Sequence, residues 1–315
     1  MRALLITSNR LGDAVLTTGA VPYLAARYPG VRLTVACGSL PAPLFEAMPQ
    51  VEEVWRIDKQ PRSRHWWSLW KRAIGRFWVH VIDLRGSAFA FTVASRRRTV
   101  MGPDRSRRHR VMHLTETLGA DAPLAPTLSW READAAEAER RLGGARSWIA
   151  IGPTANWVGK QWQAERFGEV AKALIAPGGL YADGNVLIAG APGEEAMAAP
   201  VFEALPSHRT LVAFGWPLPV LTAALASARL YIGNDSGLMH MAAAVGTPTV
   251  GLFGPSRPEL YAPWGEHSAI VQTKTSFDEF VTAPGYNRFT TGSLMGEISV
   301  DAVVAAARRL LESAK

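Results

Sequence analysis

The sequence predicts an α/β fold in which parallel sheets are covered by helices on both faces. Short apolar runs alternate with segments of helical periodicity in both halves of the chain, which is the pattern of successive βαβ units. The clearest unit is the stretch 229–256, where an apolar strand, a polar turn, a helix and a second apolar strand follow one another. A length of 315 residues with 48% apolar composition is enough for two packed domains.

The N-terminal elements are typical of a Rossmann-type domain. A strand is predicted over 3–7, a turn over 8–12, and a helix over 13–28 that Pro29 and Gly30 end, before a second strand over 31–36. The first turn lacks the G-x-G-x-x-G glycines that bring a backbone close to a dinucleotide pyrophosphate. The missing glycines argue against a nicotinamide oxidoreductase, which shares the α/β pattern.

The positive charge is concentrated in the first half. Residues 1–150 hold 23 Lys and Arg against 13 Asp and Glu, net +10, whereas the remainder holds 11 against 14, net −3. Between predicted strands over 51–57 and 77–84 lies a basic helix with Trp66, Trp67 and Trp70. Further basic runs cover 96–98 and 105–110.

Tryptophan interleaved with arginine suits an anionic membrane interface. Nucleic acid would also fit the charge, and a solvated face over a buried tryptophan seam is the structural alternative.

No apolar run has transmembrane length, and the N-terminal run is too short for a signal peptide, so a cytoplasmic protein is expected. Cys37 is the single cysteine, and no cysteine or histidine cluster has metal-ligand spacing.

The domain boundary is predicted after an acid-rich helix. The stretch 131–147 reads as a helix that Gly143 and Gly144 stop, and a new strand follows over 148–151. We therefore place a first domain at 1–145, a second at 146–297, and a helix over 298–315 that packs back on the domains. The second domain is expected to contain a helix over 164–175, strands over 186–189, 229–232 and 249–253, and a helix over 238–245.

Polar loops follow several strands of the second half. The turn 233–237 leads into a helix, whose unpaired N–H groups favour an anionic ligand such as phosphate. For Asp235 or Ser236 the alternative is a helix N-cap, and for His240 a packing residue. The loop 152–162 carries Lys160 just before a helix, and Glu194 follows the next strand, where a carboxylate can accept hydrogen bonds from ribose hydroxyls.

The run DSGLMHMAAAVGTPTVGLFGPS over 235–256 closely resembles the C-terminal signature of family 9 glycosyltransferases, the bacterial lipopolysaccharide heptosyltransferases. Leu11-Gly12-Asp13 is similar to the first loop of that family, 160–162 to its Lys-x-Trp, and 83–87 to its Asp-Leu-Gln/His-Gly-Ser stretch. The chain departs just before Leu11, where the family usually has a basic residue followed by Ser-Ser. The resemblance covers nearly the whole chain and is weakest over 56–130.

The resemblance implies a GT-B fold, with two Rossmann-like domains facing across a cleft. It implies inverting, metal-independent transfer from an ADP-heptose-like nucleotide sugar to an anionic lipopolysaccharide-core acceptor, with Asp13 as catalytic base, although by position alone Asp13 would be a helix cap. The residues implied in donor binding are Thr154, Lys160, Glu194, Asp235, Ser236, Gly237, Leu238 and His240. Those implied in acceptor binding are Arg10, Gly12 and Arg85.

No cofactor, metal site or nucleic-acid partner is expected from this resemblance. Peripheral contact with the cytoplasmic face of the inner membrane is expected from the basic, tryptophan-containing segment. Two further functional classes stay open at this point. One is a binder of anionic lipid or nucleic acid without catalysis, and the other is a GT-B sugar-nucleotide epimerase.

Overall fold

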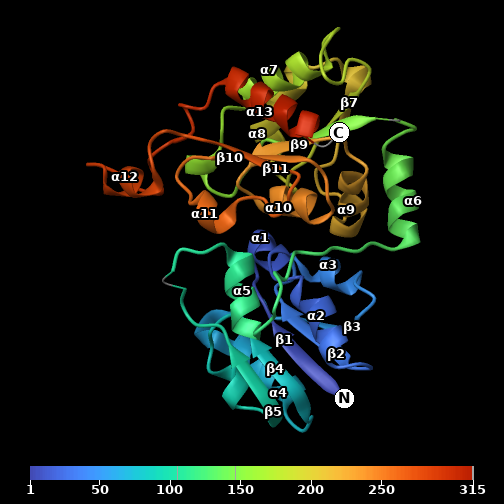
Figure 1. Cartoon of the computed structure of the whole chain (residues 1–315), viewed down its shortest axis with the longest axis vertical. Coiled ribbons are helices and arrows are strands. Elements are labelled where there is room, and N and C mark those ends of the chain that lie inside the picture. The colour runs from blue at the N-terminus through green and yellow to red at the C-terminus, as the bar shows by residue number, and fades with distance from the viewer. Residues whose placement is uncertain (105, 146, 314–315) are drawn as a thin grey trace. The chain divides into compact units, whose positions relative to one another are not determined.

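The computed structural model describes residues 1–104, 106–145 and 147–313. Arg105 of the basic run, Arg146 at the predicted boundary and the last two residues of the predicted C-terminal helix lie outside the described residues. The chain separates into two compact units, Met1–Arg131 and Glu132–Lys315 (Figure 1). Each unit contains one parallel sheet covered by helices.

The first unit is built on a five-stranded parallel sheet with the order β3-β2-β1-β4-β5. Its strands are β1 Arg2–Ile6, β2 Arg32–Cys37, β3 Val51–Arg56, β4 Trp78–Asp83 and β5 Ser95–Val100. Its helices are α1 Leu11–Val15, α2 Ala20–Arg27, α3 Ala42–Glu46, α4 Arg64–Ala73 and α5 Arg110–Leu118, with short 3-10 turns η1 Pro61–Ser63 and η2 Phe89–Phe91.

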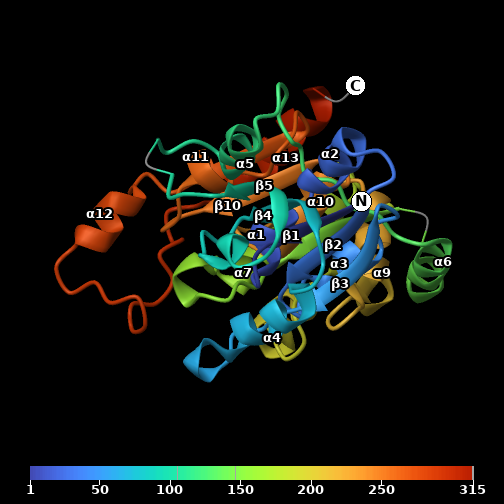
Figure 2. The ribbon, with the colours of Figure 1, turned by 90° about the horizontal axis from the view of Figure 1, so that it is seen from below.

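Alternating side chains of β1 supply both faces of this sheet. Ala3 and Leu5 pack in a core with α2, α3 and α5, whereas Leu4 and Ile6 pack in a second core with α4 and η2. Figure 2 shows α4 on one side of the strands and α2 and α5 on the other. Because both faces are covered, the central strand β1 is apolar and buried from Ala3 to Ile6. The edge strands β3 and β5 carry charged, more exposed residues.

The helix predicted over 13–28 is interrupted. α1 ends at Val15 and α2 begins at Ala20. The hydroxyls of Thr17 and Thr18 donate to the carbonyls of Ala14 and Val15, each at 2.8 Å, and such local bonds compete with the helical ladder. The sequence prediction of one continuous helix is therefore wrong across residues 16–19.

The second unit contains a six-stranded parallel sheet with the order β11-β10-β9-β6-β7-β8. Its strands are β6 Trp148–Gly152, β7 Asn185–Ile188, β8 Thr210–Val212, β9 Tyr231–Asn234, β10 Thr249–Phe253 and β11 Ser268–Gln272. Its helices are α6 Glu132–Arg141, α7 Ala164–Ile175, α8 Glu195–Ala204, α9 Leu218–Ala226, α10 Gly237–Ala244, α11 Pro258–Tyr261, α12 Phe277–Thr282 and α13 Val300–Ser313, with 3-10 turns η3 Val158–Lys160 and η4 Ser207–Arg209.

Helices α7, α8 and α13 share the core on one face of the second sheet, and Figure 1 shows α9, α10 and α11 on the other. α6 belongs to this unit because it packs against α9, and the Arg141 guanidinium lies 5.3 Å from the Trp216 ring centroid. The division therefore falls before α6, whereas the sequence placed the boundary after it. Gly143 and Gly144 mark the end of a helix and not the end of a domain.

α13 packs on the second unit through Val303, Ala306, Ala307 and Leu310. No helix of the described residues is both long enough and apolar enough to cross a bilayer.

Gly19 provides a test of the packing beside the interruption. A Cβ at Gly19 would overlap the carbonyl oxygens of Leu124 and Ala125, and backbone atoms cannot move aside cheaply. Gly19→Ala should therefore lower the free energy of unfolding by about 1–3 kcal/mol in urea denaturation. Gly102→Ala is the matched control, because a Cβ there meets open space. Equal stability of the two variants would contradict the close packing at Gly19.

Candidate functional site

The loops after β6 and β9 are brought together by the sheet. The two strands are parallel neighbours, and Gly152 at the end of β6 pairs with Gly233 of β9. Since parallel strands end at the same edge of a sheet, the segments that follow them meet there, at the place where α/β sheets bind ligands.

An ion pair joins these two loops. The Lys160 ammonium contacts Oδ2 of Asp235, and Nε2 of His240 lies 3.9 Å from Oδ1 of the same carboxylate. The side chain of Asp235 is only 5% exposed and that of Lys160 is 24% exposed. A carboxylate so deeply buried needs a positive partner, so Asp235 holds the Lys160 ammonium at the start of α10.

The capping of α10 tests the interpretation of Asp235 or Ser236 as a helix N-cap. The N-cap position is occupied by Ser236, and its side chain makes no capping hydrogen bond. Ser236, Gly237 and Leu238 are half-buried, so the first turn of the helix is partly open. Asp235 therefore serves the ion pair, and the N–H groups at the start of α10 are not capped by the Ser236 hydroxyl.

Asn234 fixes the relative position of the two loops, and sequence reasoning did not single it out. Its buried side-chain oxygen accepts a hydrogen bond from the backbone N–H of Trp162 at 3.1 Å, and its side-chain nitrogen donates to the Pro153 carbonyl at 2.8 Å. The available signal was an amide residue at the end of a buried parallel strand.

Thr154 and Glu194 occupy different environments. Thr154 is buried in the loop that follows β6. Glu194 lies after β7, the strand beside β6, and its carboxylate accepts a hydrogen bond from the Ala191 N–H at 3.0 Å within its own loop. Thr154 thus shares the loop of Lys160, whereas Glu194 extends the same sheet edge by one strand.

The segment after α12 also supports the loop 152–162. The Trp157 indole N–H donates to the Arg288 carbonyl at 2.8 Å, and the Leu294 N–H donates to the Gly159 carbonyl at 3.1 Å. The sequence suggested no function for residues 283–297. In the structure they form hydrogen bonds with the lysine-bearing loop.

The residues implied in acceptor binding gather in the first unit. β1 and β4 are parallel neighbours, and Ile6 pairs with Asp83 at their ends. Arg85 donates to the Asn9 side-chain oxygen at 3.3 Å, which joins the loop after β4 to the loop after β1. Arg10, Gly12 and Asp13 follow in the same stretch, with Arg10 exposed and the other two half-buried.

Asp13 is not the N-cap that its position suggested. α1 begins at Leu11 with Arg10 in the N-cap position, so Asp13 lies in the first turn of the helix. A carboxylate there is favoured by the helix dipole but does not fill the cap position itself.

Asp83 shapes the loop that carries Arg85. One carboxylate oxygen accepts from the Arg85 N–H at 2.9 Å, and the other accepts from the N–H and the hydroxyl of Ser87. Burial raises the pKa of Asp83, and these hydrogen bonds oppose the rise. The Arg85 guanidinium is thereby placed 4.9 Å from the Trp66 ring centroid.

Within the described ranges, no three His, Cys, Asp or Glu side chains are grouped so as to hold a metal ion.

Comparison with known proteins gives consistent results. A family model described as glycosyltransferase family 9 (heptosyltransferase) matches residues 89–282. Lipopolysaccharide heptosyltransferase 2 of Salmonella typhimurium is 25% identical over 91% of this chain and 93% of that protein. The protein of the same name from Escherichia coli is 23% identical over 88% of this chain and 89% of that protein.

Solved structures share the fold. A family 9 glycosyl transferase from Veillonella parvula superposes with a TM-score of 0.81 at 24% identity, covering 99% of this chain and 97% of that one. The E. coli ADP-heptose lps heptosyltransferase II gives 0.77 at 21% identity, covering 100% and 99%. The predicted GT-B class, with two Rossmann-like domains, is confirmed.

Removing the Asn234 side chain should loosen both loops. Asn234→Ala leaves the Trp162 N–H and the Pro153 carbonyl without this partner, and an unsatisfied buried polar group costs about 1–3 kcal/mol. We expect a loss of this size in chemical denaturation. Asn156→Ala, at an exposed position of the same loop, should leave the free energy of unfolding unchanged. A neutral Asn234→Ala would show that the two loops hold their positions without this bridge.

Proposed function

Because the chain belongs to glycosyltransferase family 9, the heptosyltransferase family, we propose that it transfers a heptose or a related sugar from an ADP-sugar to an acceptor in the lipopolysaccharide core. The observation that carries the donor side of this proposal is the Lys160 ammonium, held by a buried Asp235 at the start of α10. A fixed cation beside open helix N–H groups is suited to a diphosphate.

In the proposed donor site, Lys160 and the N–H groups of Gly237 and Leu238 bind the diphosphate. Thr154 and Ser236 donate further hydrogen bonds to it, and Glu194 accepts from the ribose hydroxyls. Asp235 and His240 keep the lysine in place. Support comes from the common sheet edge on which all these residues lie.

In the proposed reaction, the acceptor hydroxyl oxygen attacks the anomeric carbon from the face opposite the diphosphate. The hydroxyl proton passes to the Asp13 carboxylate, and the bond between the anomeric carbon and the diphosphate oxygen breaks with its electron pair on ADP. The configuration at the anomeric carbon is therefore inverted. Asp13 belongs to the first unit and Lys160 to the second.

The charge that develops on the leaving ADP is stabilised in this proposal by Lys160 and the α10 amides. These groups supply the positive potential that a divalent cation provides in other transferases, and on this basis we propose a metal-independent reaction. Formation of product only when an acceptor is present distinguishes this reaction from that of a sugar-nucleotide epimerase.

The proposed acceptor is anionic and is met by Arg10, Arg85 and the backbone at Gly12. We further propose that the enzyme works in the cytoplasm, in peripheral contact with the anionic inner face of the inner membrane. The exposed basic residues of the first unit support this contact; they include Arg62, Arg64, Lys71, Arg72, Arg96 and Arg97.

Arg98 has a structural role that distinguishes it from its two neighbours. Its guanidinium donates to the carbonyls of Ala90 at 2.9 Å and Val93 at 3.2 Å. The cluster 96–98 is therefore not uniformly a solvated face, and only Arg96 and Arg97 can be changed to test lipid contact without disturbing η2.

Changing Lys160 tests the donor site. Removing one charge-assisted hydrogen bond costs about 1.5–3 kcal/mol, so Lys160→Ala should weaken ADP binding by roughly ten- to a hundredfold in calorimetry. Adenosine lacks the diphosphate and should be affected far less. Lys172→Ala, at an exposed position on α7, is the charge-matched control and should bind both ligands normally. An equal loss for adenosine and ADP would mean that Lys160 acts through folding.

Changing Asp13 tests the base. Asp13→Asn preserves the side-chain shape but cannot take the proton, so the single-turnover rate should fall by roughly 10²–10⁴. ADP affinity and melting temperature should barely change. Asp121→Asn, at an exposed position of the same unit, controls for the loss of one negative charge. Turnover of Asp13→Asn near that of the unaltered enzyme would remove Asp13 from the mechanism.

A further inference from the structure

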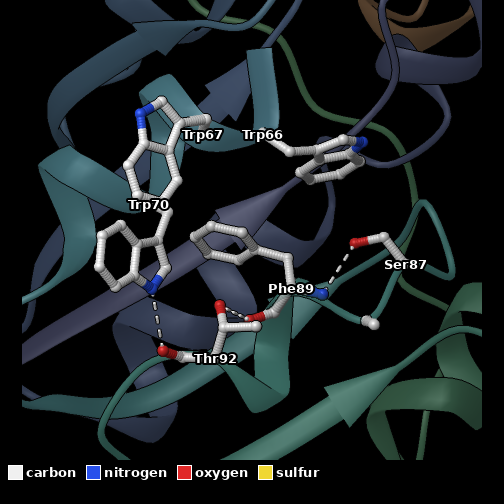
Figure 3. Close-up of a pocket in the computed structure, with 7 residues that line it drawn as sticks. Trp66, Trp67, Trp70, Ser87, Phe89 and Thr92 are labelled. Carbon is white, nitrogen blue, oxygen red and sulfur yellow. Dashed lines mark hydrogen bonds between the residues drawn. The ribbon is translucent and has the colours of Figure 1, made fainter. Parts of the chain in front are cut away.

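An open pocket of about 440 Å³ lies between α4 and the segment that follows β4 (Figure 3). Four aromatic side chains form most of its wall, namely Trp66, Trp67, Trp70 and Phe89. Ser87, Ala88 and Thr92 complete it. We refer to these seven residues as the aromatic pocket, and all of them belong to the first unit.

The rings are held in fixed pairs. Trp67 and Trp70 stack with centroids 4.8 Å apart and planes 13° apart, while Trp66 and Phe89 lie 5.9 Å apart at 29°. Leu69 and Ala73 anchor the helix in the core. The pocket is therefore a preformed apolar surface, which lowers the entropy cost of binding.

Three polar groups in the wall are already bonded within it. The Ser87 hydroxyl oxygen accepts from the Phe89 N–H at 3.2 Å, the Thr92 hydroxyl donates to the Phe89 carbonyl at 2.8 Å, and the Trp70 indole N–H donates to the Thr92 carbonyl at 3.2 Å (Figure 3). These three groups are therefore engaged within the wall, and the four aromatic rings make up most of its surface. Such a wall favours an apolar occupant.

Cations border the apolar wall. The Arg85 guanidinium lies 4.9 Å from the Trp66 ring centroid, and the Lys71 ammonium lies 5.4 Å from that of Trp67. The Asp83 carboxylate is buried and accepts hydrogen bonds from the Ser87 hydroxyl and the Arg85 backbone N–H. The rim is therefore positively charged, which complements an anionic head group attached to an apolar chain.

We propose that the aromatic pocket binds one alkyl chain of an anionic amphiphile, with the anionic group at Arg85 and Lys71. The identity of the natural occupant rests on the proposed function: it is an acyl chain of the lipid-linked acceptor. The loop 83–87 both carries Arg85 and forms part of the wall, so the chain and the acceptor head are bound by one segment. Insertion of the four rings into a bilayer fits less well. Phe89 is buried, Trp66 and Trp70 are half-buried, and of the three tryptophans only Trp67 is exposed, at 57%.

Direct binding of monomeric alkyl phosphates tests this proposal. Octyl, decyl and dodecyl phosphate are titrated into the full chain by calorimetry below their micelle concentrations, with inorganic phosphate alongside. Burial of methylene groups should tighten binding on the order of tenfold for each two carbons added. Inorganic phosphate should bind far more weakly than dodecyl phosphate. Affinity that does not change with chain length would overturn the proposal.

Two variants locate the site. Trp67→Ala removes an exposed wall, and Ala88→Leu fills the pocket from an exposed position with ordinary helical backbone angles. Each should weaken dodecyl phosphate binding about tenfold or more. Trp130→Ala and Ala122→Leu, at exposed positions of the same unit outside the pocket, should not. Unchanged binding in both pocket variants would place the chain elsewhere, and binding to acidic vesicles but not to monomeric dodecyl phosphate would show a surface anchor instead.

A turnover assay separates this proposal from the proposed function. Trp67→Ala should raise KM for an acylated acceptor and leave KM for the same acceptor after deacylation unchanged. For each acceptor, kcat of the variant should equal that of the unaltered enzyme. An equal rise in both KM values would contradict an acyl-chain site. Absence of any glycosyl transfer by the unaltered enzyme would count against the proposed acceptor, whereas the alkyl phosphate titration would still report on the pocket.

Discussion

The buried carboxylate of Asp235 is the constraint on which the second unit's candidate site depends. An isolated buried charge is costly, and the Lys160 ammonium relieves that cost by joining two loops that are distant in sequence. The same contact holds the lysine beside the first turn of α10. Asn234 adds a neutral bridge between the same loops, so the position of the cation is determined by charge and by hydrogen bonding together.

The two units use one structural principle with different residues. In each sheet, a polar residue at the end of a buried parallel strand organises a loop at that edge of the sheet. Asn234 at the end of β9 bonds to the loop that follows the neighbouring strand β6. Asp83 at the end of β4 accepts hydrogen bonds from Arg85 and Ser87 of the loop beyond its own strand. A strand end is a place where backbone groups leave the ladder and need other partners. The residues that satisfy them also decide which side chains are presented to a ligand.

Arg85 links the two features of the first unit. Its guanidinium bonds to Asn9 beside the Asp13 segment and also lies over the Trp66 ring. The basic, tryptophan-containing segment is thus neither a uniformly solvated surface nor simply a row of buried tryptophans. Part of it is core, as with Leu69 and Ala73, part holds η2 through Arg98, and part forms an apolar wall with a cationic rim.

The sequence alone determined the fold class, the family resemblance and the elements whose signals are local. The helix over 164–175 and the strand over 249–253 match α7 and β10 residue for residue, because periodicity, glycine and proline are read within a few residues. It also singled out Lys160 and Asp235, but not their contact. Only the tertiary structure decided that pairing, the roles of Asn234 and residues 283–297, the break between α1 and α2, and the assignment of α6 to the second unit. Each of these depends on which strands and loops become neighbours, and strand order is set by the packing of the whole chain, which no local pattern encodes.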